Sequence, residues 1–210
     1  MIPIDLSTWN RREHFEFFSK MSNPFFGITS EIDCTKAYAV CKEKGISFFA
    51  YYMHKSIMAS NAVKELRYRI IDGQVMELPY VNVGTTIARE DGTLWFSLTE
   101  YSEDFEVFNA RLQKEIENVQ NSEGIRLHTE DGRVDLIRHT TIPWTSFSAI
   151  LHPFNLGSGD SVPKIAFGKF RVEGDRKWLP ISIEAHHGLA DGRHLGLYFQ
   201  KFQELMDEDF

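Results

Sequence analysis

The fold is decided by the stretch Trp178–Met206, WLPISIEAHHGLADGRHLGLYFQKFQELM, because it contains a strand-like run, a short turn and a helix-like run. Apolar residues alternate from Leu179 to Ala185, which predicts a strand with one buried face, and His187 falls on that face. We therefore expect the imidazole of His187 to be shielded from water, neutral and able to accept a proton near pH 7. Its neighbour His186 falls on the polar face and is the weaker candidate for a base.

The residues after the turn predict a helix. Asp191 stands where an N-cap or first-turn carboxylate is expected, shortly after Gly188, which permits backbone conformations that a side chain would forbid. The motif thus places a titratable base and a carboxylate four residues apart at a strand-to-helix junction, a position that often carries chemistry. The apolar stripe of the helix has spacings of four, three and four residues: Leu195, Phe199, Phe202 and Met206.

Plainer interpretations of this motif have to be weighed beside the catalytic one. Taken alone, His187 is more often a hydrogen-bonded core histidine than a base, and Asp191 is more often a simple helix cap. Two histidines and an aspartate could also ligate zinc. Adjacent histidines on a strand, however, point to opposite faces and cannot easily share one ion, so we expect no metal site.

Composition limits the class of protein. With 210 residues, of which 42% are hydrophobic and 13% aromatic, the chain can bury a full core and is expected to form one domain over residues 1–210. The net charge of −7 and the lack of a Lys- or Arg-rich block argue against nucleic-acid binding. No apolar run is long enough to span a membrane, and Met1–Asp5 lacks a signal-peptide pattern, so a cytoplasmic location is expected. Cys34 and Cys41 form no metal-binding pattern and are expected to be reduced thiols.

The other periodicities predict an α+β fold in which helices cover a largely antiparallel mixed sheet. The Asp-Gly pairs at residues 72–73 and 91–92 are typical of hairpins and indicate antiparallel pairing, and residues 121–133 read as a surface loop. Helices are expected over residues 9–17, after a Ser7 or Thr8 cap, and over residues 35–44, 48–60 and 105–119. Strands are expected over residues 3–6, 27–33, 68–71, 74–76, 93–96, 138–142, 147–151, 164–172 and 178–187.

The motif also resembles a known family signature. His186-His187 followed by Asp191-Gly192 is similar to the HHxxxDG signature of chloramphenicol acetyltransferases and of the wider coenzyme A-dependent acyltransferase superfamily. The resemblance extends, in the right order, over almost the full chain, through the segments Ile4–Glu16, Ile142–Phe147 and Leu179–Ile181. It implies a chloramphenicol acetyltransferase-like two-layer sandwich and acetyl transfer from acetyl-coenzyme A to a hydroxyl.

The resemblance implies a role for four residues. His187 matches the family's general base, Asp191 its paired carboxylate, and Arg11 the arginine that forms a structural ion pair with that carboxylate. Thr140 stands where the family usually has a serine that stabilises the tetrahedral oxyanion. Threonine keeps the hydroxyl donor, but its extra methyl group restricts the rotamer. Without the resemblance, Arg11 would be interpreted as a solvated helix residue and Thr140 as an ordinary strand residue.

The resemblance also implies residues of two binding sites. Trp144 and Lys169 match positions near coenzyme A, whereas Ser47 stands where a lysine is common. Two hydroxyls common in the acceptor site are missing, because Phe18 stands where a tyrosine is common and Ala166 where a threonine is common. Such losses can alter specificity strongly. Ile150 and His152 stand where phenylalanine and leucine are usual. The acceptor candidates are Phe17, Phe18, Phe26, Ile150, His152 and Ala166. Each of these binding candidates could instead be a packing or solvated residue.

The leading hypothesis from the sequence is chloramphenicol O-acetylation, hence antibiotic resistance. It implies acetyl-coenzyme A as co-substrate, no permanently bound cofactor, and a homotrimer whose active sites lie between subunits. Two alternatives stay open: a coenzyme A-dependent acyltransferase acting on another small alcohol or on a thiol such as dihydrolipoamide, and a non-catalytic ligand-binding homologue.

Overall fold

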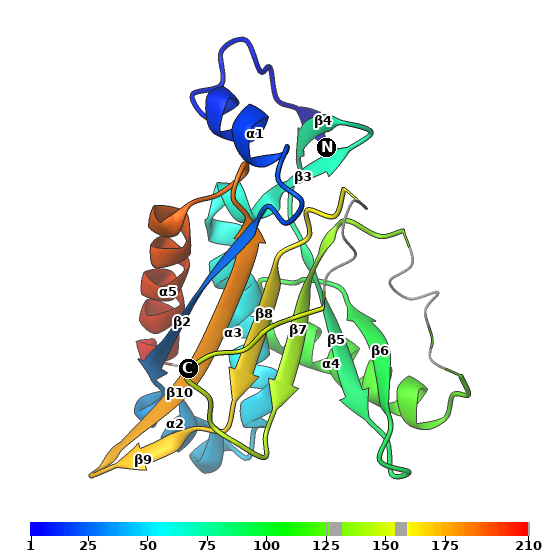
Figure 1. The fold of residues 1–210 in the computed structure, drawn as a ribbon. Coiled ribbons are helices and arrows are strands. Elements are labelled where there is room, and N and C mark those ends of the chain that lie inside the picture. Colours follow the sequence, from blue (N-terminus) through cyan, green and yellow to red (C-terminus); the bar gives the residue numbers. More distant parts are fainter. Residues whose placement is uncertain (125, 127–131, 154–158, 210) are drawn as a thin grey trace.

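A mixed β-sheet forms the centre of the molecule (Figure 1). The computed structural model describes residues 1–124, 126, 132–153 and 159–209. Within them the strand order is β2-β10-β8-β7-β5-β6, with β9 paired to β10; β5–β7 and β7–β8 are parallel and the other pairs antiparallel. The strands are β2 (Phe25–Asp33), β5 (Asn82–Ala88), β6 (Leu94–Thr99), β7 (Leu136–Ile142), β8 (Lys164–Gly168), β9 (Arg171–Glu173) and β10 (Arg176–His186).

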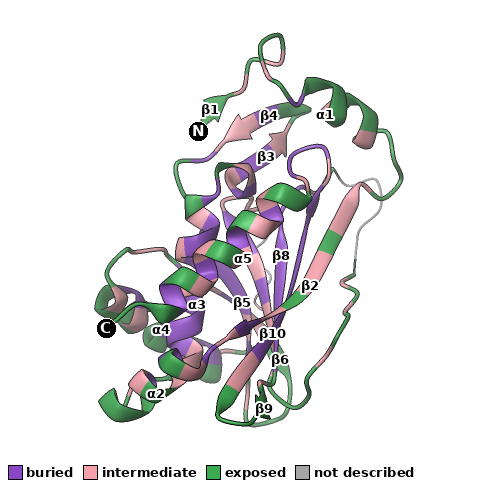
Figure 2. Cartoon of the chain, turned by 90° about the vertical axis from the view of Figure 1, so that its left-hand side faces the viewer, coloured by how far each residue is buried: buried purple, intermediate pink, exposed green. Residues whose placement is uncertain are grey.

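Helices cover one face of this sheet, as Figure 2 shows from the side. They are α2 (Thr35–Lys44), α3 (Phe48–Ala62), α4 (Phe105–Gln120) and α5 (Gly192–Asp207). The alternating apolar residues of β10, among them Ile181, Ile183 and Ala185, point into the core between the helices and the sheet. Leu195, Phe202 and Met206 of α5 lie in the same core, so the predicted stripe is confirmed. The fold is α+β, as expected.

The opposite face of the sheet is covered by the segment that follows β7. Residues 143–153 run across this face (Figures 1 and 2). The segment is tied to the sheet by the backbone N–H of Lys169, which donates to Thr145 O at 2.8 Å, and by Phe147, whose ring packs on Gly168. The polar face of β10 is therefore buried too: Glu184 is 7% exposed and His186 only 3%.

A smaller sheet lies beyond one end of the main sheet, near α1 (Arg12–Phe18) (Figure 1). Its strands are β1 (Ile2–Pro3), β3 (Tyr68–Ile71) and β4 (Gln74–Glu77), and β3 follows a short helix, η1 (Lys64–Arg67). The buried guanidinium of Arg69 donates to four backbone carbonyls, including Val134 O at 2.6 Å and Leu136 O at 2.7 Å. Arg69 thereby fixes the start of β7, the strand that carries Thr140.

Most predicted elements are confirmed, with small shifts of their ends. The hairpin at residues 72–73 has the positive φ angles that its Asp-Gly pair predicts, 50° and 78°. The second Asp-Gly pair lies in a longer connection, because Ala88 and Leu94 form the last pair of β5 and β6. Cys34 occupies the N-cap position of α2 without a side-chain capping hydrogen bond, Cys41 lies within the helix, and both are buried free thiols. Of the predicted loop 121–133, residues 125 and 127–131 lie outside the described residues.

Four sequence expectations are wrong. Residues 147–151 form no strand, because this segment packs side chains onto the sheet face instead of pairing with a strand. The expected strand 164–172 is two strands, β8 and β9, and the expected strand 3–6 is only β1 at its start. The first helix begins at Arg12, because Asp5 holds residues 7 and 8 in a turn: Ser7 N donates to Asp5 Oδ1 at 2.9 Å and Thr8 N to Asp5 O at 3.2 Å. Among the described helices, none has the length and apolar character needed to cross a membrane.

Candidate active site

His187 lies directly after β10, at the junction that the sequence singled out. Its backbone N–H donates to Pro24 O at 2.8 Å, which fixes the turn, and its side chain is half-buried. Nδ1 lies 3.2 Å from Ala190 O. A carbonyl oxygen can only accept, so this contact places the ring proton on Nδ1 and leaves the lone pair on Nε2. The tautomer is the one that a general base acting through Nε2 requires.

Two phenylalanine rings hold the imidazole from both sides. The ring of Phe18 stacks on His187 with centroids 3.9 Å apart and planes 9° apart, and Phe26 stacks with values of 4.2 Å and 28°. Phe17 contacts Phe18 edge-on and is 60% exposed. Three of the predicted acceptor residues are thus gathered around His187.

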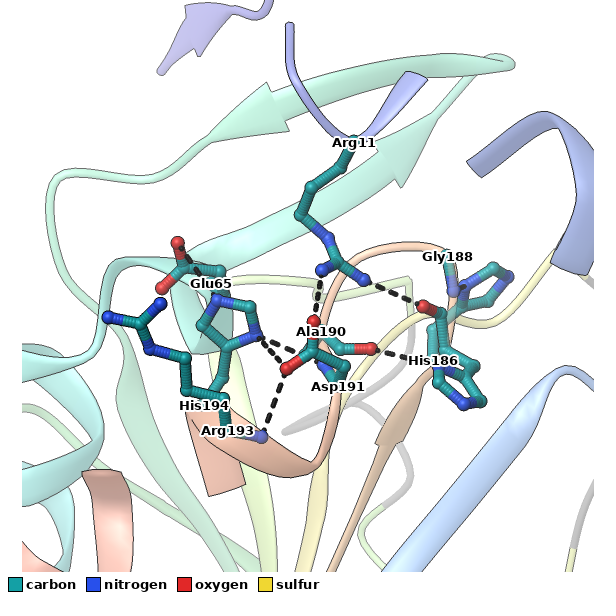
Figure 3. Close-up of polar contacts among 9 residues, drawn as sticks. Arg11, Glu65, His186, Gly188, Ala190, Asp191, Arg193 and His194 are labelled. Carbon is teal, nitrogen blue, oxygen red and sulfur yellow. Dashed lines mark hydrogen bonds and ion pairs between the residues drawn. The ribbon is translucent and has the colours of Figure 1, made fainter. Parts of the chain in front are cut away.

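Arg11 and Asp191 fix the loop that carries His187 (Figure 3). Nη1 of Arg11 lies 2.5 Å from Asp191 Oδ2, and Nη2 donates to the carbonyl of His187 at 3.0 Å. The predicted ion pair is confirmed. Burial alone would raise the pKa of the Asp191 carboxyl, but the Arg11 hydrogen bond and the neighbouring positive charges outweigh it, so this pKa is lowered. Asp191 also caps α5, because its Oδ1 accepts from Arg193 N at 3.0 Å.

Two further histidines shape the loop without offering a base. His194 Nδ1 accepts from Asp191 N at 3.0 Å, which completes a capping box, and its Nε2 lies 3.5 Å from Glu65 Oε1 (Figure 3). The capping-box signature has Glu or Gln at this position, so the sequence pattern did not predict this role for His194. His186 Nδ1 accepts from Gly188 N at 3.1 Å, and burial lowers its pKa to about 4. A Cβ on Gly188 would meet the His186 ring at 3.0 Å, which explains the glycine.

A second group of predicted residues lies on the face covered by the segment 143–153. His139 points toward the helices, where its Nε2 lies 3.4 Å from Ser56 Oγ, so the next residue, Thr140, points to the covered face. Thr140 is paired in register with Ala166, and Ala166 with Ser182. The predicted residues Ile150 and His152 belong to the covering segment itself.

The two groups are too far apart to act on one small substrate within one chain. Thr140 is in register with Ser182, two strands away, and His187 follows Ser182 by five residues. Strands about 4.8 Å apart and a rise of about 3.3 Å per residue place the two Cα atoms roughly 19 Å from each other. We call the two groups the base half-site, around His187, and the oxyanion half-site, around Thr140.

A cavity of about 510 Å³ lies on the helix side of the sheet, beside Thr141, which follows Thr140 on β7 and points the opposite way. Its lining is mostly apolar and includes Phe48 and Tyr52 of α3 and Thr141 of β7. Tyr52 and Thr141 are joined by a hydroxyl–hydroxyl hydrogen bond of 3.2 Å. Trp144 and Lys169 line the same cavity, so these two predicted coenzyme A residues lie together. Ser47 caps α3 beside it by accepting from Ala50 N at 3.3 Å.

No potential metal centre is found in the part of the chain that the structure describes: it contains no group of three or more His, Cys, Asp or Glu side chains placed to share an ion. The imidazole of His186 is already engaged by Gly188, and that of His187 by Ala190.

Comparison with known proteins gives consistent matches. The family model described as chloramphenicol acetyltransferase matches residues 1–203. A chloramphenicol acetyltransferase of Proteus mirabilis is 27% identical over 99% of this chain and 95% of its own length, and one of Staphylococcus aureus is 28% identical over 97% and 94%. A solved chloramphenicol acetyltransferase structure superposes with a TM-score of 0.90 at 31% identity, covering 97% of this chain and 98% of that one. A structure titled probable dihydrolipoamide acetyltransferase, from Listeria monocytogenes, shares the fold at 15% identity, with a TM-score of 0.67 and coverages of 99% and 94%.

Proposed function

Because the chain belongs to the chloramphenicol acetyltransferase family, we propose that it transfers the acetyl group of acetyl-coenzyme A to a hydroxyl of chloramphenicol. Acetylation of the antibiotic would confer resistance. The observation that carries the proposal is the state of His187, whose Nδ1 is held against Ala190 O and whose Nε2 is left with a lone pair. The enzyme is further proposed to be a single domain working in the cytoplasm.

His187 acts as the general base. Nε2 removes the proton of the acceptor hydroxyl while that oxygen attacks the thioester carbonyl, since a neutral alcohol is a poor nucleophile. When the tetrahedral intermediate breaks down, the C–S bond is cleaved, and the proton passes from His187 to the departing thiolate of coenzyme A. The stacked rings of Phe18 and Phe26 and the carbonyl of Ala190 keep the imidazole in one orientation throughout.

Thr140 supplies the donor for the oxyanion. Its hydroxyl projects from β7 on the covered face, where a fixed dipole can stabilise the charge that develops on the thioester oxygen. The cavity lined by Trp144 and Lys169 lies on the helix side of this strand, beside Thr141, and has the apolar lining that the pantetheine arm of coenzyme A needs. Lys169, which lines the same cavity, would pair with an anionic group of the co-substrate. Acetyl-coenzyme A enters and free coenzyme A leaves with each turnover, so no resident cofactor is part of the proposal.

The complete site needs two copies of the chain. A base half-site and an oxyanion half-site roughly 19 Å apart cannot close on the same carbonyl. If the base half-site of one subunit docks on the oxyanion half-site of the next, the predicted catalytic and acceptor residues come together. We assign the assembly as a homotrimer with three such junctions, in line with the family resemblance. The acceptor would then lie between Phe17, Phe18 and Phe26 of one subunit and Ile150, His152 and Ala166 of its neighbour.

The test is release of free coenzyme A from acetyl-coenzyme A on addition of chloramphenicol. We expect the wild-type protein to turn over and His187→Ala to lose about a thousandfold in kcat, as removal of a general base does. His14→Ala is the matched control, because His14 is exposed on α1 and should leave kcat unchanged. Near-normal turnover by His187→Ala, with an unchanged melting temperature, would contradict the role of His187 as general base.

Thr140 is tested separately. Thr140→Ala should lower kcat by about a hundredfold through loss of the oxyanion donor, whereas Thr140→Ser should keep most of the turnover because the hydroxyl remains. Equal activities of the two variants would remove Thr140 from the mechanism and leave the assignment of His187 standing.

A further inference from the structure

The covered face of β10 contains a buried carboxylate and a buried imidazole that face each other. Oε2 of Glu184 lies 3.2 Å from Nδ1 of His152, and both side chains are only 9% exposed. Neither ring nitrogen of His152, nor Oε2 of Glu184, has a hydrogen-bond partner among the described residues. The contact is therefore close but poorly aligned, and three buried polar atoms keep unused hydrogen-bonding capacity.

Neighbouring residues of the sheet make room for this pair and anchor the segment that carries His152. Gly27 stands opposite Glu184 on β2, and a Cβ there would lie 2.8 Å from Glu184 Cγ, so the glycine makes room for the carboxylate. Lys164 stands opposite Glu184 on β8, and its Nζ donates to Pro153 O at 2.9 Å, which anchors the segment directly after His152. Burial lowers the pKa of Lys164.

Leaving such atoms without partners is costly. A buried polar atom that gives up water without gaining a hydrogen bond destabilises a protein, and a charged atom destabilises it more. Apolar residues of the same volume would avoid this cost. Retention of the pair makes sense if a ligand completes its hydrogen bonds during function.

The pair is placed to contact the far end of an acceptor. Glu184 lies two residues along β10 from Ser182, the residue in register with Ala166 and, through it, with Thr140. By strand geometry the Cα atoms of Glu184 and Thr140 are about 12 Å apart, the length of a small drug-like alcohol. An acceptor whose hydroxyl attacks a thioester carbonyl held at Thr140 would bring its opposite end to Glu184.

We propose that Glu184 and His152 form a subsite that selects acceptors with a neutral hydrogen-bond donor, a hydroxyl or an arylamine N–H, at the end remote from the reacting hydroxyl. The inference rests on the proposed function and narrows its substrate class. Glu184 accepts a hydrogen bond from this group, and a ring nitrogen of His152 forms a second hydrogen bond with it. The positive charge of Lys164 beside the carboxylate makes a neutral donor a better fit than an ammonium group.

The experiment compares chloramphenicol with its analogue in which the aromatic nitro group is reduced to an amine. The nitro group can only accept hydrogen bonds, whereas the arylamine donates. We expect the wild-type protein to bind the amine at least about tenfold more tightly, as one hydrogen bond to a charged acceptor allows. Glu184→Met should abolish this preference, and Glu184→Gln, which keeps an acceptor of the same volume, should retain part of it. Glu173→Gln, an exposed carboxylate on β9, is the charge-matched control and should leave the preference unchanged.

Affinities are measured by calorimetry without acetyl-coenzyme A, and kcat/KM is measured with it. A wild-type protein that does not prefer the amine, or a preference that survives in Glu184→Met, would overturn the inference. If Glu184→Met does not fold, an unchanged preference in Glu184→Gln and in His152→Leu overturns it equally. Absence of acetyl transfer to both compounds would instead remove the proposed function, while calorimetry would still decide whether Glu184 selects the donor.

Discussion

Along β10, the apolar residues Ile181, Ile183 and Ala185 face the helices. The polar residues Ser182, Glu184 and His186 point to the opposite face, where Glu184 meets His152 of the segment that follows β7. Both sets are almost fully buried, with Ile183 at 0% and Glu184 at 7% exposure. The first set is apolar and packs in the main core. The second contains polar groups, some of them without partners among the described residues. Burial of the apolar set on the helix face stabilises the fold. Burial of the polar set on the covered face costs stability but keeps these groups available to bind a ligand.

The largest expected effect comes from the helix face. Ile183→Ala should lower the free energy of unfolding by about 3–4 kcal/mol, because it removes buried methyl groups and leaves a cavity. Ser182→Ala, its neighbour on the covered face, should cost about 1 kcal/mol or less. Urea unfolding at one fixed protein concentration measures both, since assembly adds to apparent stability. Similar losses in the two variants would mean that the faces are energetically alike.

We expect acid to lower the stability of the fold through one buried histidine on each face of the sheet. His139 on the helix side and His186 on the covered side have pKa values lowered to about 4 by burial, below the ordinary value of 6.5. In this pH interval the unfolded chain binds protons that the folded protein does not. Stability is thus fully present above pH 6.5 and falls as the pH drops toward 4, by up to about 3 kcal/mol for each histidine.

The measurement is urea unfolding between pH 7 and pH 4.5 for the wild type, His139→Asn and His186→Asn. Asparagine can still donate to Ile137 O in place of His139, or accept from Gly188 N in place of His186. Each variant should show a shallower loss of stability with acid than the wild type. An unchanged slope in one of them would show that its histidine is already protonated in the folded protein near pH 6.

A smaller effect is expected at the end of β10, where the helix face leads into the active loop. Arg11→Met should lower kcat by about tenfold, because the loop loses its contacts to Asp191 and to the His187 carbonyl while Nε2 itself is untouched. Asp191→Asn should have a similar effect, and the double variant should be little worse than either one. Additive losses would show that the two residues act independently. The pH profile of kcat separates a displaced base from a general loss of stability.

The smallest change in stability is expected when the polar pair on the covered face is replaced by apolar residues, like those on the helix face. In the double variant Glu184→Leu/His152→Leu, apolar contacts replace the poorly aligned pair, so the free energy of unfolding should stay constant or rise by about 1 kcal/mol. Glu184→Leu alone should be less stable than the double variant, because the His152 ring stays buried without its carboxylate. A clear loss of stability in the double variant would show that the pair stabilises the fold.

The sequence predicted best what depends on neighbouring residues. The alternation in β10, the stripe of α5 and the cap at Asp191 are local signals, and all three are confirmed. The contact between Arg11 and Asp191 joins residues 180 positions apart. No local pattern encodes it, and only the family resemblance predicted it.

Local sequence patterns could not predict which segment packs over a given face of the sheet. Alternation correctly assigned Glu184 and His186 to the second face of β10, but it does not reveal that another segment buries that face. The same periodicity made residues 147–151 read as a strand, although Phe147 packs on Gly168 of the sheet. Partners such as Glu184 and His152, 32 residues apart in the sequence, meet only because this segment crosses the sheet.

The separation of the base and oxyanion half-sites has a genetic consequence. Under the proposed assembly, each site takes His187 from one subunit and Thr140 from the next. Two inactive alleles, one lacking His187 and the other lacking Thr140, would complement each other when expressed together. Mixed trimers would contain junctions at which both intact residues meet. A cell could therefore stay resistant while carrying no single functional copy of the gene.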